Sequence, residues 1–377
     1  MEIFTLSTKI IFGDNALDRL KDIPYRKVLV VTDPFAEKSG MIDFVTEPLT
    51  EGGAEYELFT DVVPDPPVAK VSLGVKKMQE YQPQAIVALG GGSAIDCAKG
   101  INKVYSQVTG NPTVPLIAIP TTSGTGSEVT SFAVISDPDE NRKYPLVSAD
   151  MLPAESILDA RLVQSVPANI TAHTGMDVLT HAIEAYVSIN HNDFADALAE
   201  KAIELCGRYL LRAYVDGSDL EARAKMHSAS CLAGVAFNNV SLGVNHGIAH
   251  ALGAHFHIPH GLANAMLLPK VVEFNSGVYN VTSKYNECAR RYSRIANVLG
   301  IYSDHTASTV RALINWLSFM LEEMDIPRSV SKCGVDVMEY ASNIPNMIEG
   351  AMADSCTMTN PVKPTYQDIE KILKDIY

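Results

Sequence analysis

The stretch Ala85-Ile86-Val87-Ala88-Leu89-Gly90-Gly91-Gly92-Ser93 joins an apolar run of strand length to three glycines and the start of a helical pattern. Similar apolar runs occur at Lys27–Thr32 and at residues 115–119, and helical periodicity lies between the runs, at residues 71–81 and 93–105. Runs that are apolar on both faces are typical of strands in a buried parallel sheet. The alternation of strands and helices therefore predicts an α/β domain with right-handed crossovers.

Two loops after these strands are suited to hold a dinucleotide. The glycines at 90–92 place backbone and free helix N–H groups where a pyrophosphate can approach, although a tight strand-to-helix turn also uses glycines. Residues 120–128, Pro-Thr-Thr-Ser-Gly-Thr-Gly-Ser-Glu, offer hydroxyls to phosphate or nicotinamide, with a simple hydroxyl-rich turn as the alternative.

Asp33 closes the first strand, where its carboxylate would accept hydrogen bonds from ribose hydroxyls and repel a 2′-phosphate. This favours NAD over NADP, although Asp33-Pro34 is also a common way to open a turn. In the usual Rossmann fingerprint the glycine loop comes first and the acid about 20 residues later. Here the aspartate precedes the glycines, so the domain is not an ordinary Rossmann domain.

The sequence changes character after about Arg161. Helical patterns without strand alternation then occupy residues 170–187, 193–209, 220–237, 261–274, 284–299 and 307–324. Pro153 and Pro167 punctuate the chain near this change, and Pro167 is suited to open a helix. We therefore predict an α/β domain of residues 1–162 and an all-helical domain of residues 163–377, with a cleft between them.

Composition excludes several classes of partner. The 377 residues include 44 acidic and 30 basic side chains, a formal charge of −14, which would repel phosphate backbones and anionic membranes. We expect neither nucleic acid nor a membrane as a partner. The six cysteines lie far apart without a CxxC pair, which fits a reducing cytoplasm. Neither a signal-peptide pattern nor an apolar stretch of about 18 residues occurs, so we expect a protein that is neither secreted nor membrane-embedded.

Histidines and one aspartate indicate a metal site. Asp177 and His181 are four residues apart on one helical face, a spacing that lets two side chains share a cation. Taken alone, this pair is equally consistent with a carboxylate that stabilises the first turn of a helix and a histidine that is buried in the core.

The segment from Gly243 to Gly261 carries five of the ten histidines on a background of Ala, Gly, Leu and Ile. Buried imidazoles are costly unless each has a partner, and a metal satisfies several at once. His246 and His250 are four residues apart, and His260 follows Pro259 at the start of another helix. Asp177, His181, His246 and His260 would form a site suited to Fe²⁺ or Zn²⁺ rather than to Mg²⁺ or Ca²⁺.

His250 would then be a proton relay one turn beyond the metal ligands. The other two histidines of the segment, His255 and His257, are expected at the rim of the site or behind its ligands.

With these residues in view, the chain resembles the iron-containing (group III) alcohol dehydrogenases over essentially its full length. The motifs of the resemblance are Gly90-Gly91-Gly92-Ser93-x-x-Asp96-x-Ala98-Lys99, Pro120-Thr121-Thr122-x-Gly124-Thr125-Gly126-Ser127-Glu128-Val129-Thr130, Gly175-Met176-Asp177-x-Leu179-Thr180-His181-Ala182-Ile183-Glu184 and His246-x3-His250-x9-His260-Gly261. Residues 130–138 and 256–265 look most like the 1-propanol dehydrogenases of propanediol utilisation. The family's late Thr-Asn-Pro-Arg pattern is Thr359-Asn360-Pro361-Val362 here, followed by Lys363, so this chain departs from the family at the arginine.

The resemblance implies the dehydroquinate synthase-like fold: a Rossmann-like NAD-binding domain, an all-helical metal domain and an active site between them. It assigns the metal to Asp177, His181, His246 and His260 and places His250 beside the nicotinamide as the catalytic residue. The residues that it assigns to the dinucleotide are Asp33, Gly91, Gly92, Ser93, Asp96, Thr121, Thr122, Thr125, Thr130 and Lys143.

The activity we expect is metal-dependent, NAD(H)-linked interconversion of short-chain primary alcohols and aldehydes, such as 1-propanol and propionaldehyde. The metal, Fe²⁺ or alternatively Zn²⁺, would act as a Lewis acid on the substrate oxygen. A metal-dependent lyase on the same scaffold would need Lys and Arg around a phosphorylated substrate, and residues 246–261 contain none. A catalytically idle NAD-binding protein is the third reading, against which the four filled ligand positions argue.

From the resemblance we further expect a cytoplasmic homodimer or larger homo-oligomer. A bacterial microcompartment is the alternative location.

Overall fold

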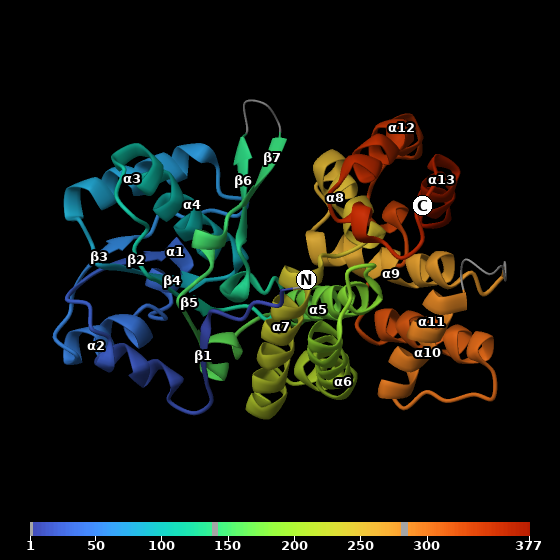
Figure 1. Cartoon of the computed structure of the whole chain (residues 1–377), viewed down its shortest axis with the longest axis horizontal. Helices are drawn as coiled ribbons and strands as arrows, with labels where there is room; N and C mark the ends of the chain where they lie inside the picture. The colour runs from blue at the N-terminus through green and yellow to red at the C-terminus, as the bar shows by residue number, and fades with distance from the viewer. Residues whose placement is uncertain (1–2, 138–141, 280–285) are drawn as a thin grey trace. The chain divides into compact units, whose positions relative to one another are not determined.

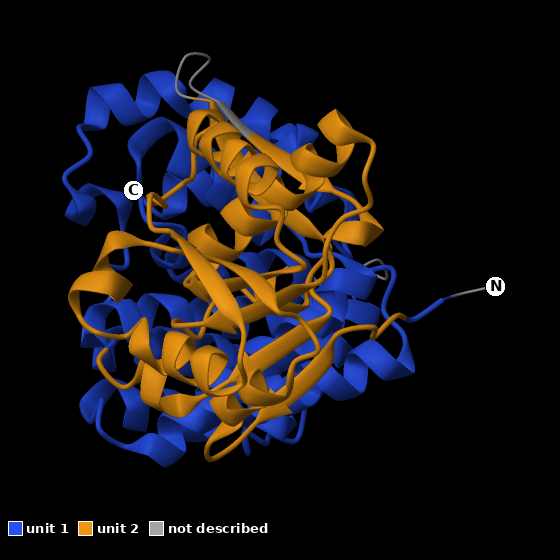
Figure 2. Ribbon diagram, turned by 90° about the vertical axis from the view of Figure 1, so that its left-hand side faces the viewer, with its two compact units in different colours: residues 1–4, 166–377 blue, residues 5–165 orange. Residues whose placement is uncertain are grey.

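The computed structural model describes residues 3–137, 142–279 and 286–377, without the side chains of residues 142 and 143 (Figure 1). Its residues pack into two compact units, which Figure 2 colours separately. One unit is Thr5–Ser165, and the other is Val166–Tyr377 with Met1–Phe4. The ring of Phe4 lies 5.5 Å from that of Phe194, within the second unit.

A six-stranded sheet forms the centre of the first unit. Its strands lie in the order β1-β8-β5-β4-β2-β3, and every neighbouring pair is parallel. The strands are β1 (Lys9–Phe12), β2 (Lys27–Thr32), β3 (Glu55–Phe59), β4 (Ala85–Gly90), β5 (Leu116–Pro120) and β8 (Glu155–Leu158). A separate antiparallel hairpin consists of β6 (Phe132–Asp137) and β7 (Arg142–Val147).

Helices cover both faces of this sheet. They are η1 (Ala16–Asp22), α1 (Pro34–Lys38), α2 (Asp43–Glu51), α3 (Val68–Tyr81) and α4 (Gly92–Thr109), with short turns η2 (Ser127–Val129), η3 (Ala149–Met151) and η4 (Ala160–Val163). Figure 1 shows α3 and α4 on one side of the sheet and α2 on the other.

The two faces of the sheet bury alternate side chains of the same strands. Leu29 and Val31 of β2 belong to the core beneath α3 and α4, whereas Val28 and Val30 belong to the core beneath η1 and α2. Successive side chains of a strand point to opposite faces, so a strand covered on both sides must be apolar throughout. The predicted parallel sheet is confirmed.

The second unit is helical over its described residues. Its helices are α5 (Ala168–Val187), α6 (Asp193–Val215), α7 (Leu220–Val240), α8 (Val244–Phe256), α9 (His260–Ser276), α10 (Asn286–Val298), α11 (Thr306–Glu323), α12 (Val337–Ala353) and α13 (Tyr366–Asp375), with short turns η6 (Val330–Cys333) and η7 (Thr357–Thr359). From Gly175 to Val187 every residue of α5 is buried. A Cβ on Gly175 would lie 2.1 Å from a methyl of Leu210, so glycine lets α6 pack closely on α5.

No helix in the described parts of the chain combines the length and the apolar character that a membrane crossing requires.

Candidate functional site

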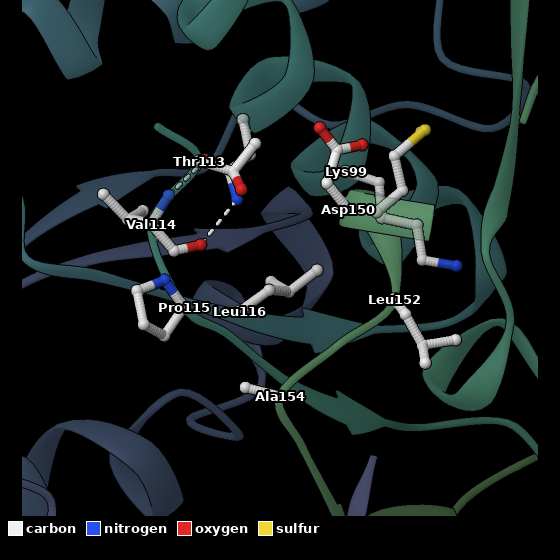
Figure 3. Close-up of a pocket in the computed structure, with 10 residues that line it drawn as sticks. Lys99, Thr113, Val114, Pro115, Leu116, Asp150, Leu152 and Ala154 are labelled. Carbon is white, nitrogen blue, oxygen red and sulfur yellow. Dashed lines mark hydrogen bonds between the residues drawn. The ribbon is translucent and has the colours of Figure 1, made fainter. Parts of the chain in front are cut away.

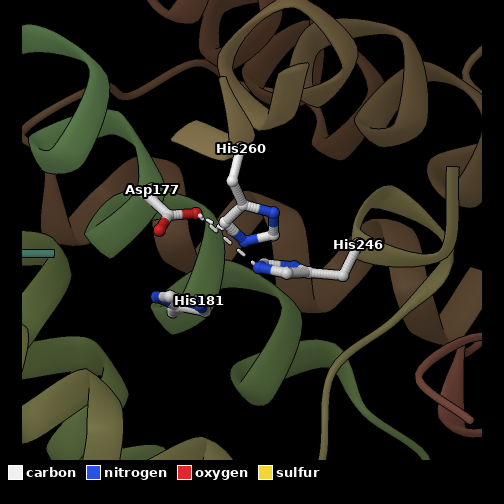
Figure 4. A group of neighbouring side chains, drawn as sticks. All are labelled: Asp177, His181, His246 and His260. Atoms are coloured by element: carbon white, nitrogen blue, oxygen red, sulfur yellow. Dashed lines mark ion pairs between the residues drawn. The ribbon is translucent and has the colours of Figure 1, made fainter. Parts of the chain in front are cut away.

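The four predicted metal ligands lie together in the helical unit (Figure 4). Asp177 and His181 come from the buried part of α5, His246 from the first turn of α8, and His260 is the first residue of α9. One ligand atom from each of the four lies within 4.8 Å of the others. Asp177 Oδ1 is 3.7 Å from His246 Nε2 and 3.6 Å from His260 Nε2.

The electrostatics of this group favour a positive charge at its centre. Burial alone would raise the pKa of Asp177, but the facing histidines outweigh it and hold that pKa well below its usual range. Burial would lower the pKa of His246, whereas Glu184 and Asp177 raise it to about 9. Burial lowers the pKa of His260 to about 3, which leaves its imidazole neutral with a lone pair to donate. One carboxylate and three imidazoles therefore fit a divalent Fe or Zn ion.

Glu184 fixes the orientation of His246. Its Oε2 lies 2.5 Å from His246 Nδ1, and its Oε1 accepts the backbone N–H of Asn245 at 2.8 Å. The Nδ1–H of His246 therefore points at a carboxylate, which leaves Nε2 as the ring nitrogen that faces Asp177. Such carboxylate–histidine pairs set the tautomer of metal-binding histidines.

The start of α8 is held by side chains from elsewhere in the chain. Its N-cap residue, Gly243, has no side chain to cap the helix, and Asn360 Oδ1 accepts the N–H of Val244 at 3.1 Å. A Cβ at Gly243 would lie 2.6 Å from Glu184 Oε1 and 2.8 Å from Asn360 Oδ1. Glycine is therefore required where these two acceptors approach the backbone.

Asn264 links three of the ligands. Its Nδ2 donates to Asp177 Oδ1 at 2.7 Å and lies 3.1 Å from Nε2 of both His246 and His260. Its Oδ1 accepts from Asn245 Nδ2 at 2.9 Å, which fixes which end of the amide faces the ligands. Asn264 is completely buried and holds the Asp177 carboxylate in place.

The first turn of α9 lies directly on α5. A Cβ on Gly261 would be 2.4 Å from the backbone oxygen of His173, so only glycine allows this approach. Since His260 immediately precedes Gly261, the close packing delivers His260 to the ligands on α5.

His250 lies one turn beyond His246, with its ring centre 6.0 Å from that of His246 and 5.3 Å from that of His260. Its Nδ1 is 2.8 Å from Asp354 Oδ2. Burial would raise the pKa of Asp354, but His250 outweighs it, and the pKa is lowered to about 2. The side chain of His250 is 42% exposed, so protons can reach it from solvent.

His255 and His257 are exposed, and His257 ends α8 in the left-handed conformation with φ of 54°.

In the α/β unit, three predicted dinucleotide residues follow neighbouring strands. Asp33, Gly91 and Thr121 come after the carboxyl ends of β2, β4 and β5, which are adjacent in the sheet. Gly91 caps α4, so the first N–H groups of that helix face this edge. Ligands of open α/β sheets bind at such edges.

The glycine loop and the hydroxyl-rich loop are in contact. A Cβ on Gly91 would be 3.3 Å from Thr122 Oγ1, and a Cβ on Gly92 would be 2.8 Å from the methyl of Thr125. Ser93 accepts the N–H of Asp65 at 3.3 Å. The structure thus brings the predicted residues of the two loops together.

Two other predicted dinucleotide residues, Asp96 and Thr130, are placed differently. Asp96 accepts from Ser127 Oγ at 2.6 Å and from the N–H of Val134 at 2.9 Å, so both its oxygens hold the loop. Thr130 is completely buried, with its hydroxyl 3.2 Å from the ammonium of Lys99. In this structure these two residues shape the loop from inside. The side chain of Lys143 lies outside the described residues.

Asp33 has a structural task as well. Its Oδ1 accepts the N–H groups of Phe35 and Ala36 and caps α1. The turn-opening alternative for Asp33 is therefore present in the structure, and it leaves the second carboxylate oxygen beside Gly90.

The sequence analysis assigned no role to five residues that support these sites: Lys99, Glu184, Asn264, Asp354 and Asn360. Glu184 and Asn264 had a usable signal, because they lie three and four residues after His181 and His260 on the same helices. Asn360 and Asp354 are more than a hundred residues from the backbone and ring that they hold.

Comparison with known proteins decides the family. Residues 7–160 match the family described as iron-containing alcohol dehydrogenase, and residues 171–377 match the C-terminal part of the Fe-containing alcohol dehydrogenase family. The chain belongs to the iron-containing alcohol dehydrogenases. This places it with the dehydrogenases rather than with lyases or idle binding proteins, and the predicted resemblance is confirmed.

Individual relatives match this dehydrogenase along its whole length. It is 41% identical to the 1-propanol dehydrogenase PduQ of Salmonella typhimurium, with 100% of both chains covered. It is 38% identical to an NADPH-dependent butanol dehydrogenase of Clostridium saccharobutylicum, with 99% of this chain and 97% of the relative covered. The structure of a 1,3-propanediol oxidoreductase superposes with a TM-score of 0.92 at 36% identity over 100% of both chains. The predicted pairing of a Rossmann-like domain with a helical domain is also confirmed.

Proposed function

We propose that this alcohol dehydrogenase interconverts short-chain primary alcohols and aldehydes, such as 1-propanol and propionaldehyde, using NAD(H) and a resident Fe²⁺, with Zn²⁺ as the alternative metal. The observation that carries the proposal is the group of Asp177, His181 and His246, which are buried, with the more exposed His260. Three imidazoles and one carboxylate with ligand atoms within 4.8 Å of one another form a donor set for such an ion.

When bound, the metal supplies Lewis acidity at the substrate oxygen and the nicotinamide supplies or accepts the hydride. The chain's own residues fix the geometry. Glu184 keeps Nε2 of His246 turned toward Asp177, and Asn264 holds the Asp177 carboxylate through a 2.7 Å hydrogen bond.

His250 is the proposed proton relay. Because its Nδ1–H is donated to Asp354, its Nε2 is the atom that can take or give a proton during alcohol–aldehyde interconversion. Partial exposure of the ring lets that proton exchange with water.

NAD rather than NADP is the proposed cofactor. The second carboxylate oxygen of Asp33 lies at the edge of the sheet beside Gly90, where a 2′-phosphate would meet a like charge. The butanol dehydrogenase relative is named as NADPH-dependent, so both cofactors occur among proteins similar to this chain. Comparing Kd for NADH and NADPH in the wild type and in Asp33→Ser tests the choice of NAD, since the variant should gain affinity for NADPH.

We also propose that the enzyme is a homodimer or larger homo-oligomer and works in the cytoplasm or in a bacterial microcompartment. Both parts rest on the family resemblance. Light scattering on the purified protein tests the assembly, and fractionation of the source cells tests the location.

The deciding experiment is NADH oxidation with propionaldehyde, using protein purified without oxygen and reconstituted with Fe²⁺ or Zn²⁺. A chelated sample is the control. Metal-dependent consumption of NADH is the expected result, and the better metal identifies the resident ion. Absence of turnover with every short aldehyde, despite bound metal and NADH, would refute the proposal.

A further inference from the structure

Lys99 is a buried lysine on α4 whose ammonium sits in a cage of oxygens. The side chain is in the interior, with only 1% of the residue exposed. Its Nζ lies 2.6 Å from the backbone oxygen of Ser127 and 2.9 Å from its hydroxyl. It is also 2.8 Å from the backbone oxygens of Thr130 and Phe132, and 3.2 Å from the hydroxyl of Thr130.

The cage has more oxygens than the ammonium has protons. A lysine ammonium carries three N–H donors, whereas five oxygens lie within 3.2 Å here. Backbone carbonyls and hydroxyls around one positive centre also form the shell that replaces water around a bound potassium ion. Lys99 therefore occupies the position of a monovalent cation, tethered to the protein by its own side chain.

The cage is connected to the loop that faces the glycines. The N–H of Ser127 donates to Thr125 Oγ1 at 3.3 Å, and the methyl of Thr125 lies against Gly92. Asp96, on the same helix as Lys99, holds the other side of the segment through Ser127 Oγ and the N–H of Val134. Removing the cation would release three carbonyl dipoles that converge on it and let this segment move.

We propose that the Lys99 ammonium acts as a built-in monovalent cation that shapes residues 121–134 for dinucleotide binding. Lys99 is a positioning residue, because its contacts are with the loop. The inference rests on the proposed function, in which this loop and the glycine turn hold NAD(H).

Lys99 also lines a neighbouring pocket, which we use for chemical rescue. This pocket, of about 180 Å³, is lined by Lys99, Asn102, residues 113–116, residues 150–152 and Ala154 (Figure 3). The Asn102 side chain donates to the backbone oxygen of Val114 and accepts its N–H, so both ends of this amide have partners within the protein. Shortening Lys99 to alanine would extend this pocket toward the cage and admit a small cation.

The test measures the Kd of NADH by fluorescence in the metal-loaded enzyme. Lys99→Met, which keeps an unbranched chain one atom shorter and removes the charge, should bind NADH at least about tenfold more weakly. Lys99→Ala should show a similar loss, and propylammonium, which replaces the missing atoms, should restore most of the affinity. Tetramethylammonium at the same ionic strength has no N–H donors and should restore none.

The matched control is Lys103→Met. Lys103 lies one turn further along α4, and its ammonium pairs with Asp150 at 2.8 Å at the surface. Its replacement should leave the Kd of NADH unchanged. Metal content should stay at the wild-type value in every variant, since the metal ligands lie in the other unit.

Several outcomes would overturn the inference. Wild-type affinity in folded Lys99→Met, or equal rescue by tetramethylammonium, would show that the ammonium does not shape the loop. If the lysine variants do not fold, Ser127→Ala removes one oxygen of the cage and should weaken NADH binding about threefold, and unchanged affinity would overturn the inference. Failure of the wild type to bind NADH would instead refute the proposed function, and this inference with it.

Discussion

Replacing Glu184 by glutamine should weaken metal binding without changing the size of the side chain. Glu184 accepts two hydrogen bonds, from Nδ1–H of His246 and from the N–H of Asn245. Glutamine has one accepting and one donating end. In either orientation of its amide, one donor must face another donor, so either His246 changes tautomer or the start of α8 loses its acceptor.

The size of the effect follows from the bond that is lost. A hydrogen bond to a charged group contributes about 1.5–3 kcal/mol. At about 1.4 kcal/mol for each factor of ten, the metal Kd should rise by roughly ten to a hundredfold. Loss of a partner behind a ligating histidine typically has an effect of the same order.

The assay is competition for Fe²⁺ or Zn²⁺ against a coloured chelator, with the metal content of purified protein as a second readout. Glu200→Gln is the control, because it removes another glutamate of the helical unit whose Oε1 accepts from the Tyr186 hydroxyl at 2.9 Å. Folded Glu184→Gln that holds metal within about twofold of the wild type would refute the reasoning.

Three further predictions concern the loops, the proton relay and stability. Gly92→Ala should raise the KM for NADH by about tenfold, because the new Cβ would lie 2.8 Å from the methyl of Thr125 in the facing loop. Gly91→Ala should have a much smaller effect, because its Cβ would lie 3.3 Å from the hydroxyl of Thr122. Equal KM values for the two variants would contradict this reasoning. His250→Ala should lower turnover by about a hundredfold and change its pH profile while the metal content stays normal, and loss of the metal would instead show that His250 is a ligand. Glu155→Gln should lower the free energy of unfolding in urea by about 1–2 kcal/mol at neutral pH, because the carboxylate pairs with Arg19 at 2.7 and 2.8 Å. The hydrogen bond from Arg19 lowers the pKa of Glu155 below 4.5, so this stabilisation is present above pH 4.5 and is lost as the pH falls below that value. A difference in unfolding free energy between wild type and variant that persists at pH 3 would argue against the ion pair.

The buried strands were predictable because burial on both faces leaves a continuous apolar run. The predicted strand Lys27–Thr32 coincides with β2, and the predicted strand at 85–89 is one residue shorter than β4. The edge strands β1 and β3 were not predicted, and neither was β8, a strand of only four residues inside the sheet. β1 has only four residues, and β3 begins Glu-Tyr-Glu with two exposed positions, so neither carries that pattern.

The helical unit was predicted where helices are long and buried. The predicted helix at 170–187 corresponds to α5, whereas α12 and α13 were missed. α12 contains Pro345 in its interior, which normally argues against a helix. α13 has only ten residues, half of them charged, so its apolar face is brief. The beginning of the predicted helix at 284–299 lies outside the described residues.

The donor set was predictable because ligands on one helix repeat every four residues, as Asp177 and His181 do. The residues that hold the donors were less accessible to this reasoning. Asn264 and Asn360 are ordinary amides in sequence, and their roles depend on helices that meet only in the folded chain. Lys99 stands within the glycine motif, but a charged residue in a helical pattern gives no sign that its side chain is buried.

The capping of α8 by Asn360 has a consequence for how the enzyme is made. All four donor residues have been synthesised once the ribosome passes His260, yet the N–H of Val244 finds its acceptor 116 residues further along the chain. A nascent chain can therefore possess every donor while the helix that carries His246 still lacks its anchor. We expect the metal to enter a finished protein rather than a growing one, so loading of the site would follow translation.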